Sequence, residues 1–231
     1  MTKPKLNPDN VLIVGDLHEP FTLDGYRQHC KQVQKEYKCG TVVFLGDIVD
    51  NHSISYHEVD PDLWSPADEM KRADIKLAQW FKDFPKAYIT WGNHDALPDR
   101  KGKTVGLPKR CFKTFREMWK LPVGWIDGPE FVIHDVLFKH KGKGGINGHL
   151  NTAISSRMST VVGHAHSVAG VAWNASSRDR IFGMNPGCGI NRKSLAFAYG
   201  KDMENKPFVG CGVVLNKGKL PLILPMELGS K

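Results

Sequence analysis

Residues 11–18 have the sequence VLIVGDLH. Four apolar residues, three of them β-branched, end at Gly15, and the polar side chains of Asp16 and His18 follow. A short apolar run that stops at a glycine is typical of a strand buried on both faces of a sheet. We therefore predict a central strand whose carboxyl end carries a carboxylate and an imidazole.

The same pattern occurs twice more in the first half of the chain. Residues 41–45, TVVFL, precede Gly46 and Asp47, and residues 87–91, AYITW, precede the sequence GNHD. Apolar residues at helical spacing over residues 23–37 and 66–84 separate the three runs. Strands that alternate with helices in this way predict right-handed βαβ units and a mainly parallel sheet.

The second half is richer in strands and has few helices. Helices are expected at residues 109–120 and 146–158. Apolar segments separated by short turns predict strands at residues 131–133, 136–139, 160–162, 168–173, 180–184, 208–215 and 220–224. We therefore predict an α/β fold in which two packed mixed β-sheets are flanked by helices, as a single domain that spans residues 1–231.

Composition narrows the class of protein. Hydrophobic residues make up 41% of the 231 residues, and no apolar run approaches the ~20 residues that a membrane-spanning helix needs. The polar N-terminal segment lacks the apolar stretch of a secretory signal, so we expect a cytoplasmic protein that binds no membrane. The five cysteines are scattered without a C-x-x-C pair, which argues against a disulfide framework and against a structural zinc site.

The chain is basic, with 32 Lys and Arg against 24 Asp and Glu and a net charge of +8. A positive field attracts anions, so nucleotides, nucleic acids and phosphoproteins are candidate partners. The alternative is that the excess cations form a solvated face. Arg100 follows the sequence GNHD closely and is a candidate substrate contact, while Lys139, Lys141 and Lys143 surround His140.

Polar side chains follow five of the predicted strands. Because ligands of open α/β sheets bind beyond the carboxyl ends of the strands, we expect these side chains to meet at one rim. Carboxylate, amide and imidazole ligands without a thiolate suit Mn²⁺, Fe²⁺ or Zn²⁺ in a site with open positions. Two such ions about 4 Å apart can activate water and stabilise charge on phosphoryl oxygens. The side chains are Asp16, His18, Asp47, Asp50, Asn93, His94, Asp95, His140, His164 and His166.

These residues form five blocks in a fixed order: DLH at residues 16–18, GDIVD at 46–50, GNHD at 92–95, a lone histidine at 140, and GHAH at 163–166. The series resembles the calcineurin-like metallophosphoesterase superfamily, whose pattern is D-x-H, G-D-x-x-D, G-N-H-[DE], a lone His and G-H-x-H. Residues 15–21, GDLHEPF, also resemble phage and bacterial members of that superfamily. If a phage encodes the chain, the expected location is the host cytoplasm.

The resemblance implies that two groups of ligands each hold one divalent metal and that one carboxylate bridges them. The expected ion is Mn²⁺, with Fe, Zn or Ni as alternatives. The first metal would be bound by Asp16, His18 and His166. The second would be bound by Asn93, His140 and His164, with Asp47 as the bridge.

The resemblance also implies that His94 stays off the metals. It would contact the phosphate or protonate the leaving oxygen, and Asn93 would contact the substrate as well as the metal. Asp50 would orient His94 through a carboxylate–imidazole hydrogen bond. His94 and Asp50 are therefore the candidate catalytic residues.

One block departs from the superfamily pattern, in which glycine often follows the lone histidine directly. Here Lys141 lies between His140 and Gly142, and His134 is a second candidate six residues earlier. We favour His140 because it ends the apolar strand predicted at residues 136–139.

The expected function is hydrolysis of phosphomonoesters or phosphodiesters by attack of a hydroxide that bridges two divalent metals. The expected partner is a phosphate-ester substrate, with nucleotides and nucleic acids among the candidates. One alternative is a nuclease that acts on DNA or RNA. An alternative of another class is a catalytically silent binding scaffold, which would be purified without stoichiometric metal. The patterns make no prediction of the oligomeric state.

Overall fold

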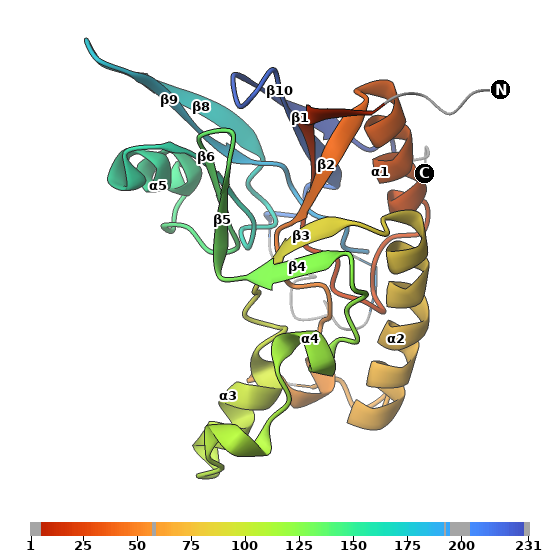
Figure 1. Cartoon of the computed structure of the whole chain (residues 1–231). Coiled ribbons are helices and arrows are strands. Elements are labelled where there is room, and N and C mark those ends of the chain that lie inside the picture. Colours follow the sequence, from red (N-terminus) through yellow and green to blue (C-terminus); the bar gives the residue numbers. More distant parts are fainter. Residues whose placement is uncertain (1–5, 57–58, 192, 195–203, 229–231) are drawn as a thin grey trace, which may run out of the picture.

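The computed structural model describes residues 6–56, 59–191, 193–194 and 204–228. Its strands form two sheets that face each other, with helices on the outer sides (Figure 1). This arrangement confirms the predicted α/β fold of two mixed sheets flanked by helices. Among the described residues, no helix is both long and apolar enough to cross a bilayer.

The first sheet has six strands in the order β11-β10-β1-β2-β3-β4. Four of them are parallel: β1 (Asn7–Val14), β2 (Cys39–Phe44), β3 (Ala87–Thr90) and β4 (Trp125–Gly128). The other two, β10 (Gly210–Leu215) and β11 (Leu220–Pro225), form an antiparallel pair at one edge. The parallel strands direct their carboxyl ends to one side of the sheet.

The second sheet has five strands in the order β5-β6-β7-β9-β8. Its members are β5 (Glu130–Ile133), β6 (Val136–Lys139), β7 (Ser159–Val162), β9 (Arg180–Asn185) and β8 (Gly170–Ala175). Strands β6, β7 and β9 run parallel, and β5 and β8 are antiparallel to their neighbours. Helix α5 (Gly148–Ser156) packs on β7, β8 and β9 from outside.

Strand β1 shows why the chain folds as a sandwich. Leu12 and Val14 belong to the core beneath helices α1 (Tyr26–Glu36) and α2 (Pro66–Asp83). The alternate residues Val11 and Ile13 belong to a second core, between the sheets. Because side chains alternate between the faces of a strand, a strand that is apolar at every position is buried on both sides.

Helix α2 begins where the sequence indicates. The side chain of Ser65 accepts a hydrogen bond from the backbone N–H of Asp68, and Pro66 occupies the first turn, where its missing N–H has no cost. Trp80 is buried and packs on Phe44 of β2, with ring centres 5.7 Å apart.

The predicted helix at residues 109–120 is wrong. The structure has a 3₁₀ turn, η2 (Lys109–Cys111), and a separate short helix, α4 (Phe115–Met118), and Cys111 is exposed. The side chains of Thr114 and Glu117 form a capping box that starts α4 at Phe115. These local hydrogen bonds stop the two segments from joining.

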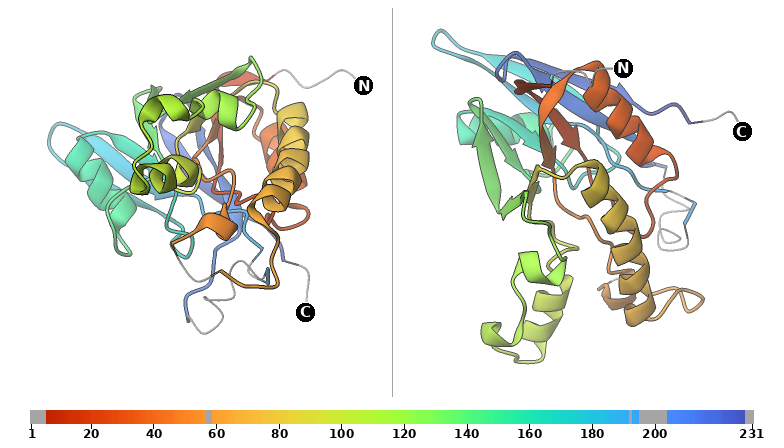
Figure 2. Two further views of the ribbon diagram at one scale, coloured as in Figure 1. Left: turned by 90° about the horizontal axis from the view of Figure 1, so that it is seen from below. Right: turned by 45° about the vertical axis from the view of Figure 1, so that its right-hand side comes forward.

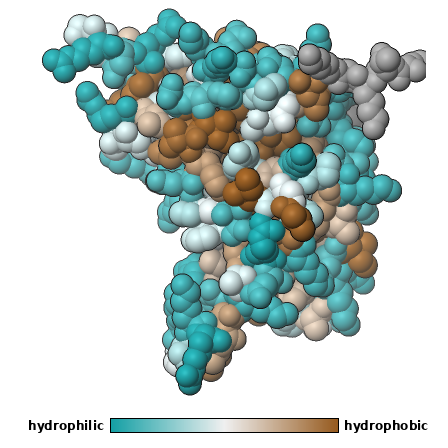
Figure 3. Space-filling view, viewed as in Figure 1, coloured by the Kyte–Doolittle hydropathy of each residue, from teal (hydrophilic) through white to brown (hydrophobic). Residues whose placement is uncertain are grey.

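Other elements in this region were not predicted. Helix α3 (Leu97–Thr104) contains a proline and a glycine, and β4 has only four residues. A 3₁₀ turn earlier in the chain, η1 (His52–Ile54), precedes α2 and was not predicted either. Strand β3 ends at Thr90, so Trp91, the last residue of the strand predicted at residues 87–91, lies outside it and is 46% exposed. Helices α3 and α4 project beyond the sheets (Figure 2), and their surface is largely hydrophilic (Figure 3).

The buried indole of Trp125 should be a main contributor to stability. It donates a hydrogen bond to the carbonyl of Phe84 at 2.7 Å, and its ring centre lies 4.6 Å from that of Phe44. We expect Trp125→Ala to lower the free energy of unfolding by about 3–5 kcal/mol, because it leaves a cavity. Val123→Ala is the control, since Val123 is 100% exposed. Urea unfolding followed by circular dichroism measures both, and equal effects would contradict the assignment.

Candidate metal centre

Nine of the sequence-predicted polar residues gather at the carboxyl ends of β1, β2, β3, β6 and β7. Potential ligand atoms form three groups, and within each group all atoms lie within 4.8 Å of one another. The groups share members, so they form one continuous cluster. They are Asp16, His18, Asp47 and His166; His18, Asp50 and His94; and Asp47, His140 and His164. Asn93 joins the last group, with its Oδ1 3.0 Å from Nε2 of His140.

Asp47 lies at the middle of the cluster and is fully buried. Its Oδ1 accepts a hydrogen bond from the backbone N–H of His94 at 2.8 Å. Its Oδ2 lies 3.1 Å from Nε2 of His140 and 3.7 Å from Nε2 of His18. One carboxylate oxygen therefore faces imidazoles from two different strand ends, as a bridging ligand would.

Asp16 holds the other side of the cluster. Its Oδ2 accepts a hydrogen bond from the backbone N–H of His164 at 2.9 Å and lies 3.0 Å from Nε2 of His166. Its Oδ1 is buried and has no hydrogen-bond partner among the described residues. A buried carboxylate oxygen without a partner is costly. A cation at this position would remove that cost, so the donor set fits a metal.

The imidazoles present the ring nitrogen that a metal requires. Nδ1 of His140 donates to the carbonyl of Leu45 at 2.7 Å, which leaves Nε2 facing the oxygens of Asn93 and Asp47. Nδ1 of His18 lies 2.5 Å from Oδ1 of Asp50, which leaves its Nε2 facing Asp47. Anchoring Nδ1 through an acceptor is the usual way to orient a metal-binding histidine.

The predicted role of the Asp50 carboxylate needs correction. Oδ1 of Asp50 contacts Nδ1 of His18, and its distance to Nδ1 of His94 is 3.6 Å. Nδ1 of His94 instead donates to the main-chain carbonyl of Asp50 at 2.6 Å. Asp50 thus orients both rings, one with its side chain and the other with its backbone, because His18 already occupies the carboxylate oxygen nearest to His94.

The backbone around the centre is tightly constrained. The carbonyl of Asp47 accepts hydrogen bonds from the N–H groups of Leu17 and His18, which joins the ends of β1 and β2. His18, Asp47 and His164 all have positive φ angles, of 52°, 46° and 67°. Such conformations are strained for residues other than glycine and cluster at functional sites.

Two glycines leave room for the buried carboxylates. A Cβ atom at Gly92 would overlap the backbone N and Oδ1 of Asp47, and one at Gly163 would lie 2.5 Å from Oδ1 of Asp16. The glycines of the GNHD and GHAH blocks therefore serve close approach of the loops to the aspartates.

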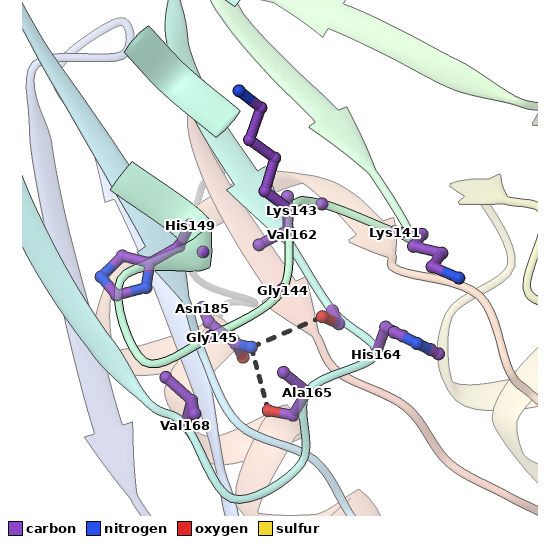
Figure 4. A pocket seen from close by; sticks show the side chains of 13 residues that line it. Lys141, Lys143, Gly144, Gly145, His149, Val162, His164, Ala165, Val168 and Asn185 are labelled. Atoms are coloured by element: carbon purple, nitrogen blue, oxygen red, sulfur yellow. Dashed lines mark hydrogen bonds between the residues drawn. The ribbon is translucent and has the colours of Figure 1, made fainter. Parts of the chain in front are cut away.

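Asp95, one of the side chains expected at the rim, and Asn185, which no sequence pattern indicated, support the centre. Asp95 accepts hydrogen bonds from the backbone N–H groups of Gly92 and Val49, at 3.0 and 3.3 Å, and so joins two of the loops. Asn185 donates to the carbonyls of Gly163 and Ala165 and holds the turn that carries His164 (Figure 4). The only signal for Asp95 was its place in the GNHD block.

Two other candidate residues, His134 and Arg100, lie apart from the cluster. Nε2 of His134 is 3.1 Å from the carbonyl of Pro8, at a turn between β5 and β6, so the structure brings His140 and not His134 to the centre. Arg100 lies on α3, with its guanidinium carbon 5.1 Å from the Tyr56 ring centre. In the described part of the chain, no side-chain hydrogen bond or ion pair joins Arg100 to the cluster.

Lys141 occupies the position where the superfamily pattern has glycine. Its side chain points the same way as that of His164, and His149 lies on the other side of the loop (Figure 4). Burial, the positive charge of His140 and, more weakly, that of Lys141 lower the pKa of His164, against the opposing effect of the aspartates. Lys141 therefore brings a positive charge close to the centre.

Opposite charges set the protonation of the cluster. Burial alone would lower the pKa of His140, but the charges of Asp47 and Asp16 outweigh it and raise the pKa to about 10. Burial opposes ionisation of Asp47, yet His140 and His18 reverse this and lower its pKa. Burial, followed by the charge of Asp47, raises the pKa of Asp95 to about 7.

A comparison of the sequence with models of known protein families identifies one family. The model of the family described as calcineurin-like phosphoesterase matches residues 10–182. No curated protein sequence matches the chain.

Solved structures show distant likenesses. Vacuolar protein sorting 29 from Cryptosporidium parvum is 13% identical, with a TM-score of 0.45 over 89% of this chain and 83% of that one. The phosphoesterase Yfce from E. coli is 15% identical, with a TM-score of 0.40 over 90% and 88%. The nuclease MPE from Pseudomonas putida is 15% identical, with a TM-score of 0.39 over 92% and 87%. At these values the likenesses say nothing about the substrate of this chain.

Metal binding should release a proton from His140. With a pKa of about 10, this imidazole is protonated at pH 7 in the metal-free protein, whereas Asp16 and Asp47, with lowered pKa values, are already ionised. A metal at Nε2 must displace that proton, so the apparent affinity for Mn²⁺ should rise with pH and level off near pH 10. Calorimetric titration in two buffers of different ionisation enthalpy measures the release. Uptake of metal without any release would contradict this.

Replacing Asp47 should affect both of the ligand groups that contain it, the one with Asp16 and the one with His140. Asp47→Asn keeps the shape of the side chain but removes the charge that faces His18 and His140. We expect the bound metal, measured by elemental analysis, to fall well below that of the unaltered protein. Asp135→Asn is the control, because Asp135 is exposed in the turn between β5 and β6. Two fully occupied ions in the Asp47→Asn variant would exclude a bridging role.

Proposed function

The chain belongs to the calcineurin-like phosphoesterase family, and on that basis we propose that it is a metal-dependent hydrolase of phosphomonoesters or phosphodiesters. The observation that carries the proposal is the carboxylate of Asp47, whose Oδ2 faces Nε2 of both His18 and His140. These three side chains come from the ends of β1, β2 and β6, so only the folded chain brings them together.

The proposed ligands of the first ion are Asp16, His18 and His166, and those of the second are Asn93, His140 and His164, with Asp47 shared. Mn²⁺ is the proposed ion, with Fe, Zn and Ni as alternatives, because a mixed set of carboxylate, amide and imidazole donors suits all of these metals. When bound, two such ions would supply a bridging hydroxide near neutral pH and offset negative charge on the phosphoryl oxygens.

His94 is the proposed proton donor to the leaving oxygen. Its Nδ1 donates to the carbonyl of Asp50, which leaves Nε2–H to act on the substrate. Burial lowers its pKa, but the charges of Asp47 and Asp50 outweigh burial and raise the pKa above the usual value. A raised pKa increases the cationic fraction of the ring near neutral pH, and the cation can both stabilise negative charge and transfer a proton.

Two further residues would contact the substrate. Asn93 lies next to His94, with its Oδ1 against His140, so its amide N–H₂ group can donate to a phosphoryl oxygen. Arg100 begins the exposed part of α3 a short distance along the chain, where it can contact a larger substrate.

A hydrolysis panel with added Mn²⁺ tests the proposal. It should compare 4-nitrophenyl phosphate with its bis-ester and include mononucleotides, cyclic nucleotides, phosphopeptides and DNA. Metal-dependent release of product from any of these supports the proposal. A protein that is purified without stoichiometric metal, and that hydrolyses none of them, would instead be a silent binding scaffold.

The proposed role of His94 predicts a loss of turnover without a loss of bound metal. We expect His94→Ala to lower kcat by about 10²–10⁴-fold, the range for loss of a general acid or base, while metal content is unchanged. His134→Ala is the control, because that histidine contacts only the carbonyl of Pro8 among the described hydrogen bonds. Unchanged turnover in the His94 variant would remove it from the reaction.

A further inference from the structure

A basic projection follows the metal centre directly. Residues 97–118, here called the basic lobe, comprise α3, η2 and α4 and begin three positions after His94. The lobe extends beyond the sheets on the side where the strands of the first sheet end (Figure 1, Figure 2). The N–H of Leu97 donates to the carbonyl of His94, so the base of the lobe is hydrogen-bonded to the centre itself.

Most of the net charge of the protein lies in this lobe. It contains seven basic residues and two acidic ones, a net charge of +5, whereas the whole chain carries +8. A charge concentrated on a short projection gives a strong local field, and the like charges repel one another, a repulsion that a bound anion would offset. The concentration therefore indicates an anionic partner.

Six of these cations form no ion pair with any acid that the structure describes: Arg100, Lys101, Lys103, Lys109, Arg110 and Lys113. Lys31 on α1 and Lys120 just after the lobe, by contrast, lie 2.7 and 2.5 Å from Asp83 and Asp74. The cations of the lobe are thus left to interact with something outside the chain.

Two of the cations are held in place by an aromatic ring. Nζ of Lys101 lies 3.9 Å and the guanidinium carbon of Arg100 5.1 Å from the ring centre of Tyr56. The electron-rich face of an aromatic ring attracts a cation and so orients its side chain. Arg100 and Lys101 are therefore pre-positioned, and the partner gains from this order.

An exposed indole packs on the lobe. Trp91 is 46% exposed, and the GNHD block follows it directly. Its Nε1–H donates to Asp127 at 3.2 Å, and its ring centre lies 6.2 Å from that of Phe115 in α4. Stacking of a base on an exposed aromatic ring is the usual means of binding an unpaired nucleotide.

We propose that the basic lobe and Trp91 bind a single strand of nucleic acid and direct one of its phosphodiesters to the metal centre. The cations of the lobe contact successive phosphates, and Trp91 stacks on a base next to the bond that is cut. Lys141 adds a positive charge beside His164. This inference rests on the proposed function and names its substrate class.

An anionic membrane is the other surface that a basic projection could meet, and Val105 and Leu107 are exposed near the tip of the lobe. A membrane that touched only the tip would not use the cations held by Tyr56, nor Trp91 at the base. A strand that runs from the tip to the centre uses all of them.

The test compares two triple variants of the full chain with equal net charge. Lys103→Gln, Lys109→Gln and Arg110→Gln remove exposed cations of the lobe, and Lys35→Gln, Lys82→Gln and Lys86→Gln remove exposed cations elsewhere. Fluorescence anisotropy measures the Kd for a labelled 20-nucleotide single-stranded DNA, in EDTA to prevent metal-dependent cleavage, over a range of salt concentrations. A duplex of the same sequence and vesicles containing phosphatidylserine are the other probes.

We expect the lobe variant to bind the strand about tenfold more weakly and to lower the slope of log K against log salt by about 2, since each lost phosphate contact contributes about 0.7. The control variant should stay within about twofold of the unaltered protein, and the duplex should bind more weakly than the single strand, because only unpaired bases stack on Trp91.

Three results would overturn the inference: equal losses in both variants, duplex binding as tight as that of the strand, or lobe-dependent binding of vesicles without binding of DNA. Hydrolysis of the bis(4-nitrophenyl) ester by the unaltered protein with Mn²⁺ checks the proposed function separately. Strand binding through the lobe without ester hydrolysis would contradict that function and not the nucleic-acid surface.

Discussion

The fully buried carboxylates of Asp16 and Asp47 are the constraint on which the centre depends. A buried charge is tolerated only with a partner of opposite charge. Here the partners are imidazoles, among them His140, which faces both aspartates and has a raised pKa. A proton satisfies this arrangement in the metal-free protein, and divalent ions would satisfy it better, because Oδ1 of Asp16 has no hydrogen-bond partner among the described residues.

The scaffold meets this constraint through its two cores. Packing on both faces of β1 leaves that strand no freedom to shift, and the carbonyl of Asp47 joins the ends of β1 and β2. Gly92 and Gly163 then allow two more loops to approach the aspartates. The rigid part of the fold thus carries the groups whose distances matter for binding metal.

Charge is arranged differently outside the centre. Within it, positive and negative groups face each other and balance, whereas the basic lobe carries most of the net charge on an exposed projection. Residues that bind metal must be held within fractions of an ångström by a rigid shell. Contacts with a long anionic substrate tolerate more variation, because the field of exposed cations acts over about 10 Å at moderate salt.

Much of the fold could be predicted because its signals are local. The apolar run at residues 11–14 and the Ser65–Pro66 start of α2 depend on neighbours in the sequence, and the structure has a strand and a helix there. The region after Thr90 could not be predicted in the same way. The capping box of Thr114 and Glu117 interrupts the expected helix at residues 109–120, and β4 has only four residues, paired in parallel with β3.

In the candidate site, too, some features follow from the local sequence and others depend on the tertiary structure. The sequence by itself determined which residue types follow each strand, because the DLH, GDIVD, GNHD and GHAH blocks are contiguous. Only the tertiary structure decided that Asp50 turns its carboxylate to His18 and its carbonyl to His94, that His140 rather than His134 joins the cluster, and that Trp91 is exposed. The reason is physical: hydrogen-bond partners and burial depend on residues distant in the chain, and no local pattern specifies which of them come together.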